Sequence, residues 1–202
     1  MQRTLTIRES LGQLRDRRYL SILLFGFCSG FPWVLHGTVL TLWLQESGFS
    51  RSTIGFIGAI TVVYAFNWTW APFVDRLRLP YLFERLGQRR SWILTCQVVI
   101  AVLVTGLSFT HPNENLLLVG SLALGVAISS ATLDISIDAY RITLFRKEEM
   151  DSKMPFAAAT STVGYFAGWN FVGGAVAIAL AGETIGLDWT VVYRIIAGFY
   201  LV

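Results

Sequence analysis

The sequence predicts an all-α membrane protein, and three observations carry that prediction. Of the 202 residues, 54% are hydrophobic and only 14% are charged, which leaves too much apolar surface for a soluble globule. Charge-poor runs of about 20 residues, the length that a helix needs to cross a bilayer core, follow one another along the chain. Basic residues gather in every second connection between these runs, as they do in the cytoplasmic loops of membrane proteins.

Six membrane-spanning helices are expected behind a cytoplasmic N-terminal arm. The arm covers residues 1–18, and the transmembrane bundle at 19–202 divides into apolar runs at 19–44, 53–74, 91–109, 116–140, 155–181 and 189–202. The last run holds 14 residues, about 21 Å of helix at ~1.5 Å per residue, against a bilayer core about 30 Å thick. We therefore expect the sixth span to be incomplete.

The basic residues predict the orientation of the bundle. Fourteen of the 16 Lys and Arg residues lie in the arm, the second loop or the fourth loop, leaving Arg51 in an odd-numbered loop and Arg194 inside the sixth span. By the positive-inside rule, the N-terminus and the even-numbered loops are cytoplasmic. The formal net charge of +3 thus reflects topology. Lipid is the expected surroundings and nucleic acid is not an expected partner, because no basic and aromatic cluster lies on a soluble element.

Cysteine and histidine give no sign of a metal or a cofactor. Cys28 and Cys96 lie inside apolar spans, where we interpret them as small packing residues rather than a disulfide. His36 and His111 have no Cys, Asp or Glu at ligand spacing. We therefore expect neither a metal site nor a cofactor.

The first span carries a polar and aromatic stripe. Ser29, Trp33 and His36 follow i, i+4, i+7 spacing and so share one face of a helix, which Pro32 and the neighbouring glycines loosen. The stripe indicates a cavity lining. For His36, a hydrogen bond to a neighbouring helix is an equal alternative.

The second span is expected to present a face to the same cavity. That face carries Tyr64, Asn67 and Trp68 and ends in Asp75 and Arg76 at the cytoplasmic surface. An Asp at the negative end of a helix is poorly placed by the helix dipole, so Asp75 should have a cationic or helix N-terminal partner. The nearest cations are Arg76, Arg89 and Arg90, for which an ordinary solvated interface is the alternative.

The fourth span carries the strongest functional signal. Ser130, Asp134, Asp138 and Arg141 lie at i, i+4, i+8, i+11 on one face. An ionisable carboxyl at membrane depth is costly, so it is a candidate for transport, proton relay or gating. Asp134, about 27 Å along the helix from its start, should lie just inside the cytoplasmic boundary and take up and release a coupling proton. Asp138 should lie at the boundary, in a gate ion pair with Arg141 or in an interfacial pair without a transport role.

The fifth span is rich in glycine. Gly164 and Gly168 lie four residues apart and are followed by Gly173 and Gly174, while Ser161, Tyr165 and Trp169 follow successive i+4 steps. Small residues at this spacing let two helix backbones approach closely. Close packing alone explains these glycines, but two bundles that slide or rock against each other would also need such a smooth face. We expect Gly164 and Gly168 to contact a helix of a second bundle, with Tyr165 and Trp169 facing the cavity.

Several motifs now resemble those of the major facilitator superfamily. The segments at 71–76 and 87–92 are similar to that family's loop between spans 2 and 3; its residues here are Asp75, Arg76, Gly87, Arg89 and Arg90. The segments at 30–32, 54–55 and 130–141 resemble AmpG-type muropeptide permeases and their acetyl-CoA transporter relatives. The resemblance covers about residues 24–181.

This resemblance implies a twelve-span transporter of two six-helix bundles, of which this chain is the N-terminal one. It implies that spans 1 and 4 line a central cavity and that spans 2 and 5 face the C-terminal bundle, which is the expected partner. It also implies proton-driven uptake of a small solute, anhydromuropeptides, across the bacterial inner membrane for cell-wall recycling.

The chain departs from the family pattern at four positions, and this opens an alternative. Thr41, Asn67, Leu133 and Phe166 remove polarity or charge from spans that should face the cavity. A more aromatic cavity suits a less polar ligand, and sister transporters of this branch import siderophores of the pyochelin and rhizobactin type. A membrane-embedded enzyme or a pore is more remote, because the sequence has no nucleophile, base and orienter set and only two buried acids.

Overall fold

The computed structural model describes residues 16–182 and 185–199, apart from the side chains of 171–173 and 199. Every regular element in this part of the chain is helical, which confirms the predicted all-α class. In chain order the elements are α2 (Arg17–Val34), η1 (Leu35–Val39), α3 (Leu40–Glu46), α4 (Arg51–Gly58), η2 (Ala59–Thr69), α5 (Ala71–Arg76), α6 (Leu82–Leu107), α7 (Leu116–Thr143), η3 (Lys147–Glu149), α8 (Met150–Ala167), η4 (Gly168–Val176), α9 (Ala177–Ala181) and α10 (Trp189–Phe199).

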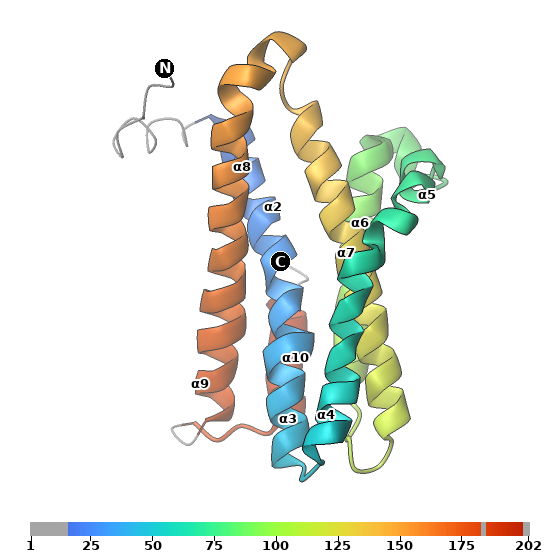
Figure 1. The fold of residues 1–202 in the computed structure, drawn as a ribbon, viewed down its shortest axis with the longest axis vertical. Helices are drawn as coiled ribbons and strands as arrows, with labels where there is room; N and C mark the ends of the chain where they lie inside the picture. Colours follow the sequence, from blue (N-terminus) through green and yellow to red (C-terminus); the bar gives the residue numbers. More distant parts are fainter. Residues whose placement is uncertain (1–15, 183–184, 200–202) are drawn as a thin grey trace.

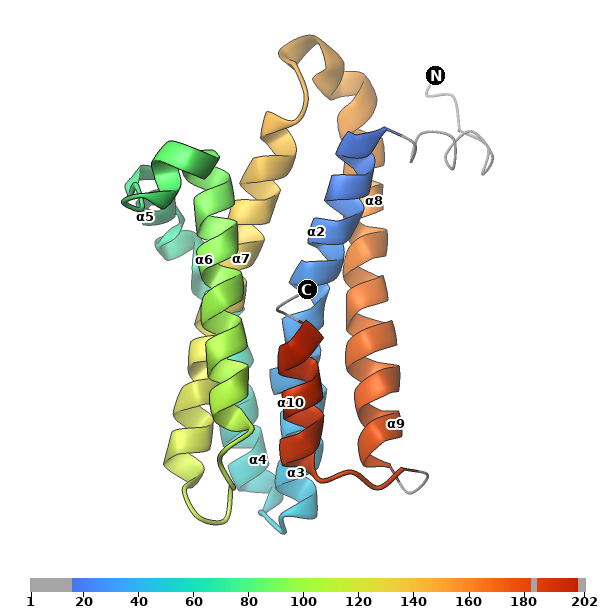
Figure 2. The same cartoon turned by 180° about the vertical axis from the view of Figure 1, so that it is seen from behind.

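Among the described residues, five continuous helical rods are long and apolar enough to cross a membrane: Arg17–Glu46, Arg51–Thr69, Leu82–Leu107, Leu116–Thr143 and Lys147–Ala181. They stand side by side (Figure 1), so that α2 lies between α8 and α7, while α6 packs against α7. The shorter α10 packs against α6 on the other side of the bundle (Figure 2). Residues 200–202 of the expected sixth span lie outside the described residues.

Polar side chains fix where several of these helices begin. Asp16, Ser50 and Asn115 accept hydrogen bonds from the backbone N–H groups of Arg18, Thr53 and Leu118, at 3.0, 3.2 and 2.9 Å. Such caps satisfy N–H groups that the first helical turn leaves without partners. The sequence therefore fixes where these helices begin, through the capping residues, as well as their apolar central segments.

The second rod is not the continuous α-helix predicted over 53–74. After α4 it continues as the 3₁₀-helix η2, stops at Trp70 and restarts at α5, whose first turn holds Pro72. Residues three apart are eclipsed in a 3₁₀-helix, so Tyr64, Asn67 and Trp70 share a face and are partly buried. Trp68, which an α-helical period placed on one face with Tyr64 and Asn67, points away from them and is 68% exposed. The error came from applying the α-helical period.

The glycines of the fifth rod pack within this bundle, which corrects the prediction that they meet a second one. A Cβ atom added at Gly26, Gly30, Gly164 or Gly168 would overlap a backbone carbonyl oxygen of the facing helix; the partners are Ser161, Tyr165, Leu23 and Phe27, respectively. Each helix thus contributes a pair of glycines four residues apart. Gly174 faces no other helix, and the surroundings of Gly173 lie outside the described side chains.

Candidate functional site

Asp134 reaches across from α7 to α2. Its Oδ1 accepts a hydrogen bond from Ser29 Oγ at 2.5 Å, and Ser29 itself is only 8% exposed. Within the described residues, Asp134 forms no ion pair. A hydroxyl donor from another helix is therefore the polar contact that supports this carboxyl.

The carboxyl lies deeper than the sequence suggested. Asp134 is about 14 Å from the end of α7 at Thr143, and its partner Ser29 is about 18 Å from the start of α2 at Arg17. Rods of 28 and 30 residues, about 42 and 45 Å long, overhang a core of about 30 Å by roughly 6 to 8 Å at each end. With each rod centred on the core, the pair would lie about 8 to 10 Å inside it, because α7 extends beyond the predicted end of the span.

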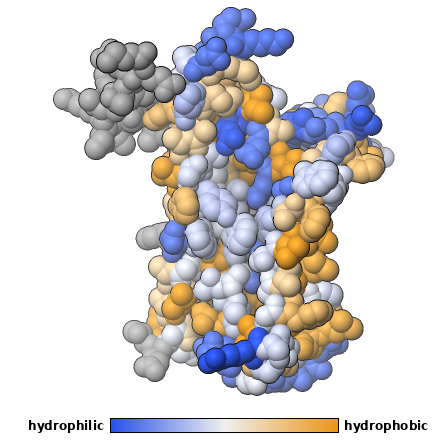
Figure 3. All heavy atoms as spheres, viewed as in Figure 1, coloured by the Kyte–Doolittle hydropathy of each residue, from blue (hydrophilic) through white to orange (hydrophobic). Residues whose placement is uncertain are grey.

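A polar cavity of about 360 Å³ opens beside this pair, between α2, α7 and α8. Its lining residues are Ser29, Asp134, Ile137, Asp138, Arg141, Ala158, Ser161, Thr162 and Tyr165. Figure 3 shows hydrophilic side chains gathered in the upper part of this face, with hydrophobic side chains on either flank. Hydroxyls and charges inside an apolar rim can bind a polar solute.

Asp138 and Arg141 form an ion pair at the cavity wall. Arg141 Nη2 lies 3.1 Å from Asp138 Oδ1, and the side chain of Asp138 is 64% exposed against 22% for Arg141. Arg141 Nε is buried and has no hydrogen-bond partner among the described residues. One edge of the guanidinium is therefore paired with a solvated carboxylate, and the rest is uncommitted.

Trp33, His36 and Tyr64 form an aromatic cluster farther from the start of α2 than Ser29. Their ring centroids lie 4.8 Å apart for Trp33 and Tyr64, 5.5 Å for His36 and Tyr64, and 5.6 Å for Trp33 and His36. His36 is 3% exposed. Both of its ring nitrogens, the Tyr64 hydroxyl and Ser130 Oγ are buried without a hydrogen-bond partner in the described part of the chain. The expected stripe is thus brought together with Tyr64, and His36 bonds to no neighbouring helix there.

The remaining predicted cavity residues are not all gathered there. Tyr165 lines the cavity, but Trp169 is 37% exposed and lies against Phe166, with ring centroids 5.7 Å apart. Asn67 is partly buried on the 3₁₀ face. Sequence reasoning missed Trp70, whose Nε1 donates to Thr132 Oγ1 at 3.1 Å and ties η2 to α7. A period of three could have identified it.

The predicted loop motif of residues 75–90 joins the end of α5 to the start of α6. Arg89 pairs with Asp75, the cationic partner that the helix dipole calls for, while Arg90 Nη2 donates to the Tyr140 hydroxyl at 2.9 Å. Gly87 adopts φ 76° and ψ 172°, a conformation that glycine reaches without strain, and it kinks the start of α6. Arg76 is exposed.

Gln88 is a second residue that sequence reasoning missed in this loop. Its Nε2 donates to the carbonyl oxygens of Val74 and Leu77, both at 2.8 Å. These contacts satisfy acceptors at the end of α5 that a helix leaves free. The signal was its place between Gly87 and Arg89 in the motif.

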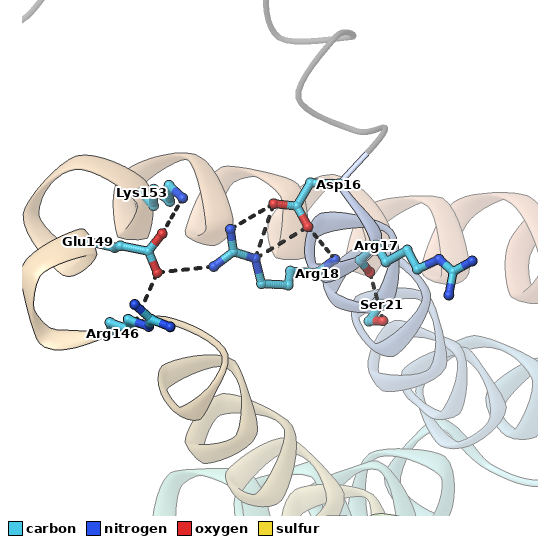
Figure 4. Close-up of polar contacts among 7 residues, drawn as sticks. All are labelled: Asp16, Arg17, Arg18, Ser21, Arg146, Glu149 and Lys153. Atoms are coloured by element: carbon cyan, nitrogen blue, oxygen red, sulfur yellow. Dashed lines mark hydrogen bonds and ion pairs between the residues drawn. The ribbon is translucent and has the colours of Figure 1, made fainter.

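A cluster of charges fastens the start of α2 to the α7–α8 connection (Figure 4). Arg18 lies 2.8 Å from Asp16 and 3.1 Å from Glu149, and Lys153 also pairs with Glu149. Hydrogen bonds from the Arg18 side chain and backbone hold the pKa of Asp16 below its usual value. The cluster joins α2 and α8 at the same end as the polar cavity.

Comparison with known proteins gives a family and several relatives. The family model described as Major Facilitator Superfamily matches residues 22–202. The chain is 32% identical over 188 residues to AmpG 4 of Rickettsia felis, covering 93% of this chain and 44% of that protein. It is 31% identical over 180 residues to the anhydromuropeptide permease of Escherichia coli K12, covering 89% of this chain and 34% of that protein. The chain thus spans less than half the length of these curated relatives.

Proposed function

Because the chain belongs to the Major Facilitator Superfamily and is AmpG-like, we propose that it forms part of a proton-coupled transporter that carries anhydromuropeptides into the cytoplasm. It is a multi-pass membrane protein with five helices of spanning length. The expected setting is the bacterial inner membrane, with the N-terminus cytoplasmic. The activity is movement of a solute rather than its chemical conversion.

One observation carries the proposal: Asp134, on a helix of spanning length, lines a polar cavity and has a Ser29 hydroxyl but no ion-pair partner among the described residues. An ionised carboxyl in this setting is costly, and a bound proton removes its charge. A site that opens first to one side of the membrane and then to the other would let Asp134 take up a proton outside and release it inside. The proton gradient would then drive the solute.

The Asp138 and Arg141 pair is proposed as a gate at the cytoplasmic end of the cavity. Its partners lie one turn apart on a single helix, so the pair can open without moving the rod. A second six-helix bundle is the proposed partner of the outward faces of the second and fifth rods. Phe56 and Val163 on those faces are 83% and 62% exposed.

Accumulation in membrane vesicles tests the proposed coupling, with the protein encoded by the whole gene. Asp134→Asn should bind solute and exchange it, but lose accumulation driven by an imposed pH gradient. Asp138→Asn, a matched change one turn away, should slow uptake without uncoupling it. An Asp134→Asn protein that still concentrates solute in response to the gradient would remove this residue from the mechanism.

The proposed substrate is tested by complementation of two strains side by side, one defective in muropeptide recycling and one in siderophore uptake. The hydroxyl-rich cavity and the name of the Escherichia coli relative favour rescue of the first. Rescue of the second strain alone would replace the anhydromuropeptide with a siderophore. Rescue of neither strain would contradict both the anhydromuropeptide and the siderophore as the substrate.

The proposed orientation is tested by labelling single cysteines with an impermeant reagent in a cysteine-free version of the whole protein. Arg85→Cys should be protected in intact cells, whereas Gly48→Cys, at the turn between α3 and α4, should be labelled. Gly48 has φ 83°, so Ser47→Cys is the safer companion at the same turn. Labelling of Arg85→Cys together with protection of Ser47→Cys would contradict this orientation and indicate the opposite one.

A further inference from the structure

The cavity holds one cation with unused hydrogen-bonding capacity. A guanidinium has five N–H donors in a planar fork that matches a carboxylate. In Arg141, Nη2 pairs with Asp138, while Nε is buried and unpartnered among the described residues. The structure thus provides a forked donor at the wall of a cavity that could contain an organic acid.

Asp138, the present partner of Arg141, competes only weakly with a solute carboxylate for the guanidinium. Asp138 is 64% exposed, and it is held by proximity on the same helix, at i and i+3. Exposed ion pairs of this kind contribute little because water solvates the carboxylate well when the pair is broken. A carboxylate inside the cavity, less accessible to water, can take the place of Asp138 on the guanidinium.

The charge of the cavity links such an anion to the proton. With both aspartates ionised, the lining carries two negative charges and one positive charge from Asp134, Asp138 and Arg141. The other titratable groups near Asp134 are Tyr64 from η2, Cys96 from α6 and Tyr165 from α8. Phenols and thiols are ordinarily neutral near pH 7. An entering carboxylate therefore meets a net negative lining that one proton on Asp134 neutralises.

We propose that Arg141 binds a carboxylate of the transported solute in exchange for Asp138, and that this carboxylate and the proton on Asp134 bind cooperatively. The inference deepens the proposed function, on which it rests for transport as such. Cooperativity is reciprocal, so bound solute holds the proton and bound proton holds the solute. The two would then cross the membrane together, which is the requirement for symport.

The test compares an acid and its amide on the protein encoded by the whole gene. The probes are an anhydromuropeptide and the same compound with its peptide carboxylates converted to amides, measured by vesicle uptake and by thermal stabilisation of the purified protein. Arg141→Gln should raise the KM for the acid on the order of 10- to 100-fold, the usual effect of losing a charged hydrogen bond. The KM of Arg141→Lys for the acid should lie between those of wild type and Arg141→Gln, because Lys keeps the charge but not the planar pair of donors.

The amide should already bind wild type weakly, and Arg141→Gln should change its KM little. Arg194→Gln is the matched control, since this guanidinium lies 5.1 Å over the Phe109 ring, away from the cavity. Asp138→Asn should tighten binding of the acid. The KM for the acid should fall as the outside pH is lowered, and Asp134→Asn should give a low KM that no longer depends on pH.

The outcomes separate this inference from the proposed function. Equal effects of Arg141→Gln on acid and amide would overturn the inference alone and leave Arg141 a structural residue. Acid that stabilises wild type through Arg141 without being transported would overturn the proposed function alone. Acid that neither binds nor is transported would overturn both.

Discussion

Helix α2 makes two contacts of opposite character, one with α8 and one with α7. Toward α8 it presents Gly26 and Gly30, and the two backbones meet with no room for a Cβ atom. Toward α7 it presents Ser29, which bonds to Asp134 beside a polar cavity. One face of α2 therefore makes a close backbone contact, and the other makes a polar contact beside a cavity.

The difference shows which parts of the bundle can move. A glycine contact between backbones is held by close packing and has one good arrangement, so α2 and α8 behave as one body. The charges of Arg18 and Glu149 reinforce that body at its end. A hydrogen bond at a cavity wall can be exchanged for one to a solute or lost on protonation. The contact with α7 is thus the one whose polar groups can be exchanged.

Filling the glycine contact should have the largest effect. Gly30→Leu places a side chain against the Tyr165 backbone, which cannot yield as a side chain could. We expect a loss of stability of about 3 kcal/mol or more and no uptake, measured by thermal unfolding in detergent. Gly120→Ala in α7, where a Cβ meets nothing within 4 Å, should be neutral or slightly stabilising. Equal behaviour of the two variants would contradict the contact.

Removing the hydroxyl from the α7 face should impair uptake and leave the fold intact. Ser29→Ala takes away the donor to Asp134, a loss of about 1.5 to 3 kcal/mol for a charged hydrogen bond, or roughly 10- to 100-fold in uptake rate. Ser121→Ala serves as the control, because that hydroxyl is exposed and bonds to its own helix. Normal uptake by Ser29→Ala would show that the bond is dispensable to transport.

The 3₁₀ register of the second rod predicts a smaller effect. Trp70→Phe keeps a smaller aromatic ring and removes the N–H that bonds to Thr132, at a cost of about 1 kcal/mol or more in the free energy of unfolding. Trp68→Phe, at an exposed position, should cost nearly nothing. A larger cost at 68 than at 70 would restore the α-helical face that the sequence suggested.

The charge cluster should give the smallest effect and a dependence on pH. Asp16→Asn should cost under about 1 kcal/mol, since the pair is largely solvated. The pKa of Asp16 is lowered in the folded protein, so its contribution is complete above the ordinary value of 3.8 and is lost as the pH falls through the folded value. Unfolding measured from pH 6 to pH 3 checks this, with exposed Glu148→Gln as the control. A difference in the free energy of unfolding between wild type and Asp16→Asn that grows toward low pH would contradict this prediction.

The sequence by itself determined the class of the fold and the apolar runs that form the five spanning rods of the described chain, but not every residue that faces the cavity. Apolar length and charge are local properties, and the bilayer converts them directly into helices. Asp134 and Arg141 were each visible for the same reason, since an ionisable group in an apolar run stands out wherever it faces. Asp75 could also be predicted to need a cation, because a helix end has a fixed dipole.

Only the tertiary structure decided which faces meet. Gly164 and Gly168 mark a close contact, but nothing in their spacing says that α2 is its other side. The 3₁₀ turns of η2 moved Trp70 inward and Trp68 outward, because helix type depends on neighbouring helices as well as on local propensity. Ser29 became the partner of Asp134 through a contact between residues 105 apart in the chain. Such pairings depend on how whole helices pack together. A single sequence shows which residues lie on each helix face, but not which faces meet.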